Sequence, residues 1–189
     1  MVLYYDPLSK RESVEWHKPG EAPPKKVKVT QSAKRIMAMI FWHCRGILLI
    51  DFIERNTTVN AAYSTSLLHK LRNAITEKRR GILSRGFRLL HDDASVHTVA
   101  VAKAAVKGCG FKEIEHPPYS LDLPPSGYYL FSKLKKDLWG KIFDDDEEVK
   151  TAVMEHFADK EPEYFLKGIE LLVHRCEKCV EIKGDYFEK

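Results

Sequence analysis

Two acidic residues, Asp92 and Asp93, follow the short strand-like run Phe87–Leu90 after one residue, His91, and His97 is close by in the chain. In open α/β sheets, functional groups gather at the carboxyl ends of strands, which is where Asp92 would lie. Carboxylate oxygens are the ligands that Mg²⁺ prefers. Two such ions, about 3.5–4 Å apart, activate a water or a hydroxyl and stabilise the leaving oxygen of a phosphodiester. That chemistry needs acids from several strands, and an isolated Asp-Asp pair is more often a helix cap.

A second unusual stretch, HPPYSLDLPPSGYYLF, spans residues 116–131. Its proline-rich part, residues 117–125, predicts a loop because proline lacks the backbone N–H that helices and strands use. A helix is expected to follow from Gly127 to Trp139. Gly127 thus stands at a loop–helix junction, and Asp122 lies nearby in the loop.

The four cysteines are too few and too scattered for a disulfide framework, so we expect reduced thiols. Cys176 and Cys179 form a C-x-x-C pair, which is compatible with a zinc or redox site. No second pair occurs at a suitable spacing, and the surrounding segment is predicted to be helical. Metal binding at this pair is therefore the weaker alternative.

Strands dominate the first third of the chain, and helices dominate the rest. The runs Arg35–Cys44 and Gly46–Glu54, separated by a turn, predict a hairpin of two buried strands. Thr58 is the expected N-cap of a helix, and its apolar face would contain Leu67, Leu68, Leu71 and Ile75. The other expected elements are strands at Val2–Tyr5, Ser13–Trp16, Phe87–Leu90 and Phe111–Ile114, and helices at Val96–Val106, Gly127–Trp139, over 144–160 and over 161–182.

This order of elements predicts the α/β fold class, with a mixed sheet flanked by helices. The 189 residues are enough for one domain with a sizeable core. No apolar run reaches the ~20 residues of a membrane helix, and the start of the chain has no signal-peptide pattern. We therefore expect an intracellular protein with no membrane partner.

The formal net charge of +4 and the pI of about 8.8 favour a polyanionic partner only mildly. Two basic stretches, residues 23–35 and 77–85, could follow a phosphate backbone, although each could also be a solvated loop. The first begins PPKKVKV, which also fits a short nuclear import signal. The candidate nucleic-acid contacts are Lys25, Lys26, Lys28, Lys34, Arg35, Lys78, Arg79 and Arg80.

Several motifs in the right order resemble the mariner family of transposases. They are YDPLSKRESVEW (5–16), FWHCRGILLIDFIERNTTVNAAY (41–63), HDDASVHT (91–98), EIEHPPYSLDLPPSGYYLF (113–131), GKIFDDDEEVKTAV (140–153) and EKCVEIKGDYFEK (177–189). The resemblance covers essentially the whole chain. The same family supplies the transposase half of a methyltransferase–transposase fusion, but nothing in this chain resembles a methyltransferase.

The resemblance implies an RNase H-like catalytic domain that cuts and joins DNA with three aspartates and two Mg²⁺ or Mn²⁺ ions. Asp92 matches the second aspartate, while Asp93 replaces an asparagine and Ser95 a proline of that motif. Gly127 takes the place of the third aspartate, and Cys176 takes that of a tryptophan.

The first aspartate of the family would fall ahead of Met1, as would its paired helix-turn-helix DNA-binding domains. The resemblance therefore predicts a single domain over 1–189 with a truncated first strand and without those DNA-binding domains.

We accordingly expect a catalytically inactive domain that keeps Asp92 as a metal ligand, binds Mg²⁺ or Mn²⁺ weakly or not at all, and retains weak, non-specific DNA binding. A homodimer and a nuclear location are further expectations. Two alternatives remain open at this point. One is residual metal-dependent DNA nicking by Asp92, Asp93 and Asp122, and the other is a non-enzymatic module that binds DNA or protein.

Overall fold

The computed structural model describes residues 2–4, 35–54, 57–79, 81–84, 86–91, 100–114, 120, 123–141, 143 and 145–183. Several predicted features lie outside these ranges: the strand Ser13–Trp16 and the residues Lys25, Lys26, Lys28, Lys34, Arg80, Asp92, Asp93, Ser95, His97 and Asp122. Of Arg35, the backbone is described as the start of a strand, but the side chain is not.

The predicted hairpin is confirmed. Strands β1 (Val2–Tyr4), β2 (Arg35–His43) and β3 (Gly46–Ile53) form an antiparallel sheet in the order β1-β2-β3. A β-bulge interrupts the β2–β3 register between Phe41 and Trp42. The turn between these two strands requires Gly46, whose φ of 130° lies where residues with a Cβ are rarely found.

Helix α1 (Ala61–Lys78) buries the apolar face that its periodicity predicts, namely Leu67, Leu68, Leu71 and Ile75. Its predicted cap was wrong, because the N-cap is Asn60 rather than Thr58. The Asn60 Oδ1 accepts a hydrogen bond of 2.9 Å from the backbone N–H of Tyr63. Asparagine is as good a cap as serine or aspartate, since its short side chain reaches the free N–H groups of the first turn.

Strand β4 (Arg88–Leu90), helix α3 (Ala100–Gly108) and strand β5 (Lys112–Ile114) form a β-α-β unit with β4 and β5 parallel. The sequence predicts this unit with similar bounds. Among the described strands, β4 and β5 pair only with each other, so the backbone ladders form two sets, β1-β2-β3 and β4-β5.

The second half of the chain is helical, as predicted. It contains η2 (Ser126–Phe131), α4 (Ser132–Leu138), α5 (Asp146–Ala158) and α6 (Pro162–Glu181). The helix expected from Gly127 to Trp139 begins as the π-helical turn η2 and continues as α4. Short π-helical stretches are rare and frequently occur at functional sites.

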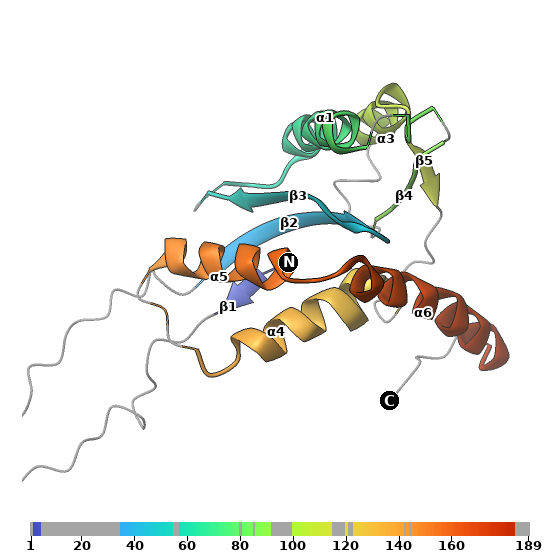
Figure 1. Ribbon diagram of the computed structural model, residues 1–189. Coiled ribbons are helices and arrows are strands. Elements are labelled where there is room, and N and C mark those ends of the chain that lie inside the picture. Colours follow the sequence, from blue (N-terminus) through green and yellow to red (C-terminus); the bar gives the residue numbers. More distant parts are fainter. Residues whose placement is uncertain are drawn as a thin grey trace, which may run out of the picture.

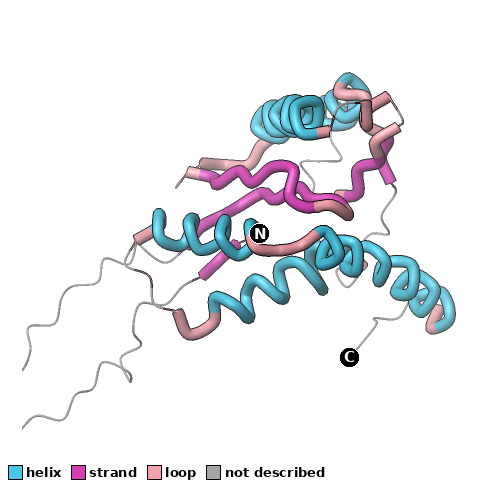
Figure 2. Tube along the Cα trace, viewed as in Figure 1, coloured by secondary structure: helices cyan, strands magenta, loops and turns pink. Residues whose placement is uncertain are grey.

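The helices lie in two layers on either side of β2 and β3 (Figure 1). Helices α1 and α3 cover one face, and α4, α5 and α6 lie on the other; Figure 2 shows β2 and β3 in magenta between these layers. None of the helices in the described ranges is long and apolar enough to cross a membrane.

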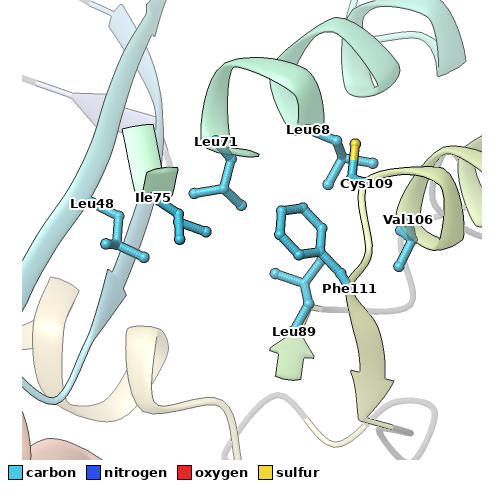
Figure 3. Close-up of a cluster of buried hydrophobic side chains, with 8 residues drawn as sticks. All are labelled: Leu48, Leu68, Leu71, Ile75, Leu89, Val106, Cys109 and Phe111. Carbon is cyan, nitrogen blue, oxygen red and sulfur yellow. The ribbon is translucent and has the colours of Figure 1, made fainter. Parts of the chain in front are cut away.

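Each layer has its own buried apolar cluster. The cluster beneath α1 and α3, drawn in Figure 3, consists of Leu48, Leu68, Leu71, Ile75, Leu89, Val106, Cys109 and Phe111. The cluster on the side of α4, α5 and α6 consists of Ile36, Leu130, Leu134, Val149, Val153, Phe157 and Phe165.

Candidate active site and nucleic-acid interface

A cavity of about 760 Å³ lies where β2, α1, β4, η2 and α6 meet. His91, at the carboxyl end of β4, and Gly127, in η2, both line it. The structure thus brings the two predicted motifs to one place, although Asp92 itself lies outside the described residues. This convergence is what a site at the carboxyl end of a strand requires.

Two hydrogen bonds, one of Ser126 and one of Gly127 itself, hold this part of η2 at the cavity. The indole Nε1 of Trp42 in β2 donates a hydrogen bond of 3.0 Å to the Oγ of Ser126. The backbone N–H of Gly127 donates to the carbonyl of Pro124 at 2.9 Å. The start of η2 is therefore fixed to the sheet, and the position of residue 127 is defined by its surroundings even without a side chain.

Behind Gly127, two tyrosines attach η2 to helix α6. The hydroxyl of Tyr128 donates to the carbonyl of Gly168 at 2.8 Å. The Tyr129 ring packs so closely that a Cβ at Gly168 would lie 2.6 Å from it, so this contact requires glycine. Burial raises the pKa of Tyr128 to about 12, against the opposing charge of Arg175, whose guanidinium lies 4.0 Å above the ring.

One described acid near the cavity, Glu113, is paired with a cavity-lining histidine. The Nε2 of His91 lies 2.8 Å from the Oε1 of Glu113 in β5. Within the described ranges, no group of three or more histidine, cysteine, aspartate or glutamate side chains could hold a metal ion. Gly127 adds no carboxylate ligand either. The described part of the site therefore does not fit a two-metal centre.

The C-x-x-C pair receives no support as a metal or redox site. Burial, followed by the neighbouring Cys179 and Glu177, raises the pKa of the Cys176 thiol. Metal ligation and thiol exchange both need the thiolate, which a raised pKa disfavours. In the part of the chain that the structure describes, neither cysteine belongs to a group of metal-ligating size.

Two of the predicted DNA contacts, Lys78 and Arg79, are described at the end of α1. The Nζ of Lys78 donates a hydrogen bond of 2.9 Å to the carbonyl oxygen of Leu48. This cation is therefore already engaged in part by the protein backbone. Burial lowers the pKa of His43, and the charges of Arg79 and Arg45 lower it further. Both guanidinium groups therefore lie near His43, at the same end of the β2–β3 hairpin.

Arg45 was not among the residues that the sequence singled out. It lies in the hairpin turn and is exposed, whereas the basic stretches that drew attention are longer runs of charge. The signal for it was the predicted turn itself, since a long cation at a hairpin tip projects from the surface. In the folded chain Arg45 and Arg79 both lie near His43, although they are far apart in the sequence.

The structure also reveals an engaged carboxylate, Asp51, in β3. The Tyr63 hydroxyl donates to its Oδ2, and the Lys70 Nζ lies 2.7 Å from its Oδ1. Burial and the hydrogen bond to Asp51 raise the pKa of Tyr63 to about 12. With both oxygens occupied by partners on α1, this acid fastens α1 to β3 and is not free to bind a metal.

Comparison with known proteins gives consistent results. A family model described as "Transposase (partial DDE domain)" matches residues 6–85. The chain is 31% identical over 189 residues to the Mariner Mos1 transposase of Drosophila mauritiana. It is 28% identical over 187 residues to the Histone-lysine N-methyltransferase SETMAR of Homo sapiens. It spans 54% of the length of the first relative and 27% of the second.

Solved structures agree in fold. The crystal structure of the catalytic domain of Mos1 mariner transposase matches with a TM-score of 0.78 and 34% identity, over 82% of this chain and 76% of that one. The Mos1 mariner paired end complex with Mn matches with a TM-score of 0.82 and 30% identity, over 100% of this chain and 55% of that one. The predicted α/β, RNase H-like class is thereby confirmed.

Proposed function

Because this chain belongs to the mariner transposase family, we propose that it is a transposase-derived domain that binds DNA without cutting it. The observation that carries the proposal is Gly127, a residue without a side chain at the cavity where the family motif has an aspartate. Asp92 is the aspartate that we assign as retained.

The loss of activity follows from the ligand requirements of the metal ions. Mg²⁺ needs near-octahedral oxygen coordination and gives up its water reluctantly. The Mos1 transposase catalytic domain has been solved with Mg and with Mn, so a divalent ion belongs to the family. Without a carboxylate at position 127 the site has one oxygen ligand fewer and holds these ions more weakly, and a weakly held ion cannot stabilise both the attacking and the leaving oxygen.

The DNA-binding part of the proposal rests on two described cations and on the relatives. Arg45 and Arg79 lie near His43 at one end of the hairpin, where they could contact phosphates. A solved relative is a Mos1 transposase paired-end complex with the left transposon end. Phosphate contacts of this kind are independent of sequence and weaken steeply with salt.

Nicking of supercoiled plasmid in Mn²⁺ tests the first part. We expect no nicking by the chain beyond that of an Asp92→Ala variant, which serves as the matched control for contaminating nuclease. Cooperative thermal unfolding of both samples shows that they are folded. Nicking that disappears in Asp92→Ala would mean that a working site persists, and the proposal of inactivity would be wrong.

Fluorescence anisotropy with a labelled DNA duplex at several salt concentrations tests the second part. We expect Arg45→Ala and Arg79→Ala each to weaken binding to all duplexes alike and to reduce the salt slope by about 1. Lys167→Ala, an exposed lysine on α6, is the matched control and should change neither. Equal effects of all three variants on DNA binding would show that the turn end of the β2–β3 hairpin is not part of the DNA interface.

Three further assignments complete the proposal. We assign residues 1–189 to one domain, place the protein in the nucleus because of the basic stretch that begins PPKKVKV, and allow a homodimer. Imaging of a fluorescent fusion with Lys25 and Lys26 replaced by alanine tests the location. Sedimentation at several concentrations tests the dimer.

A further inference from the structure

Trp139, at the end of α4, is the most exposed large apolar side chain among the described residues, at 87%. Tryptophan is highly buried on average, so an indole left this open is unusual. Helix α4 ends here, because Trp139 has extended backbone angles and Gly140 follows with a φ of 77°. The apolar face of α4 is used elsewhere, since Leu134 is fully buried and Leu138 packs against the same core cluster. Trp139 therefore stands outside the core, and the packing of the chain does not account for it.

Two lysines flank this indole on one face of α4. Lys136 and Lys135 precede Trp139 by three and four residues, which is the spacing of neighbours on a helix surface. Both side chains are exposed, and neither ammonium group has an ion-pair partner among the described residues. The end of α4 therefore presents an aromatic ring between two free positive charges.

The acids that come closest to Trp139 in the sequence have partners within the protein. The Oδ2 of Asp137 lies 3.0 Å from the Nδ1 of His156 in α5. At the start of α5, Asp145 caps the first turn with its side chain, and the Oε1 of Glu147 lies 2.6 Å from the Nζ of Lys150. These carboxylates are engaged by groups other than the two flanking lysines, which keep their charge for an external anion.

An exposed indole between two cations has the chemistry of a site for single-stranded nucleic acid. Proteins that bind single strands combine cations that follow the phosphates with aromatic rings on which unpaired bases stack. The bases of a duplex stack on one another, so a duplex makes no use of the ring. A membrane surface fits less well, because it needs an exposed apolar helix face and that of α4 is buried in the core.

We propose that the end of α4 binds single-stranded nucleic acid, with one unpaired base stacked on Trp139 and neighbouring phosphates in contact with Lys135 and Lys136. This deepens the DNA binding proposed above and rests on its premise of a polyanionic partner, but the ligand is an unpaired strand. The surface is separate from the turn end of the β2–β3 hairpin, where Arg45 and Arg79 lie. Stacking accepts any base, so the site has little sequence preference.

Fluorescence anisotropy of the full chain with a fluorescein-labelled oligo-dT of about 12 nucleotides tests the proposal. We expect saturable binding, and we expect Trp139→Ala to weaken it by about 10-fold, which is the effect of losing one stacked base. Trp139→Phe keeps an aromatic ring and should retain most of the affinity. Because this side chain is exposed, circular dichroism should show both variants folded.

An abasic oligonucleotide of the same length is the matched control, because it keeps the phosphates and lacks the bases. We expect Trp139→Ala to leave binding of this control unchanged. Lys135→Ala and Lys136→Ala should weaken binding of both oligonucleotides and each reduce the salt slope by about 0.7. Lys167→Ala, at an exposed position on α6, should change neither. Stacking should also quench the tryptophan fluorescence of the chain, and Trp139→Phe should lose this quenching.

A DNA duplex measured beside the oligo-dT separates this proposal from the hairpin interface. If Arg45→Ala left duplex binding unchanged while Trp139→Ala still weakened oligo-dT binding, only the hairpin interface would be wrong. The proposal for α4 would be wrong if oligo-dT did not bind saturably, or if Trp139→Ala weakened neither oligonucleotide or both equally. It would also be wrong if phosphatidylserine vesicles, and not oligo-dT, changed the tryptophan emission, because the partner would then be a membrane surface.

Discussion

The two sides of the turn η2 differ in how tightly they are packed. On the inner side, Tyr129 and Leu130 are buried, and Tyr129 presses against Gly168 of α6. On the outer side, Gly127 is exposed to a cavity of about 760 Å³. The comparison shows that the helices around a candidate site can be tightly packed while the position expected to carry the acid has no side chain.

The physical reason is that the two sides serve different requirements. The inner contacts bury apolar area and satisfy hydrogen bonds, so they stabilise the fold whatever residue stands at position 127. The outer position contributes only through the chemistry of its side chain. A substitution there can remove a function at almost no cost in the free energy of unfolding. We propose that glycine at position 127 is such a substitution.

The largest expected effect is on the packed side, at Phe165 of α6. This side chain is 1% exposed, so we expect Phe165→Ala to lower the free energy of unfolding by about 3–5 kcal/mol. Leu172→Ala, on the cavity side of the same helix, should cost less than ~1 kcal/mol because this side chain is only half-buried and lines the cavity. Urea denaturation measures both, and similar losses would contradict the comparison.

The next effect is at the contact between α6 and η2. A Cβ at Gly168 would lie 2.6 Å from the Tyr129 ring, so Gly168→Ala should destabilise by about 1–3 kcal/mol. Gly108→Ala, at the end of α3, is the matched control because nothing lies within 4 Å of its Cβ position. Denaturation measures the free energy of unfolding of both variants. If Gly168→Ala lowered it no more than the control does, the Tyr129 ring would have to move aside freely.

A smaller and pH-dependent effect is expected at Tyr128. Removing its hydroxyl with Tyr128→Phe frees the carbonyl of Gly168 and should cost about 0.5–1.5 kcal/mol near neutral pH. Burial raises the pKa of this phenol from 10.0 to about 12, so the unfolded chain ionises first as the pH rises.

The stability contributed by the neutral phenol is therefore fully present below pH 10 and is lost as the pH rises from 10 toward 12. The difference in unfolding midpoint between the natural chain and Tyr128→Phe should narrow over this range. Thermal unfolding followed at pH 8, 10 and 11.5 measures it. A difference that stays constant would mean that the hydroxyl is not buried against α6.

The smallest effect is expected on the cavity side. Gly127→Asp introduces a solvated carboxylate at an exposed position, so stability should change by no more than about 0.5 kcal/mol. The informative measurement is Mn²⁺ affinity by calorimetry beside Gly127→Asn, which has the same shape without the charge. Strong destabilisation by both variants would show that the outer side of η2 is packed as well.

Local patterns in the sequence determined much of this protein. The hairpin of β2 and β3, the buried face of α1 and the β4–α3–β5 unit follow from periodicity and turn residues that act within a few positions. From the family motifs we also predict that Gly127 replaces an aspartate. The cap at Asn60 was missed because asparagine and threonine are both acceptable caps, and the sequence does not show which one begins the helix.

Only the tertiary structure decided how these pieces meet. The hydrogen bond between Trp42 and Ser126 joins residues 84 positions apart, and no local pattern encodes such a contact. The same holds for Arg45 and Arg79, which both lie near His43, for the partners of Asp51, and for the cavity lined by α1 and α6. Propensity acts through neighbouring residues, whereas packing, burial and the cavity depend on which distant surfaces come into contact.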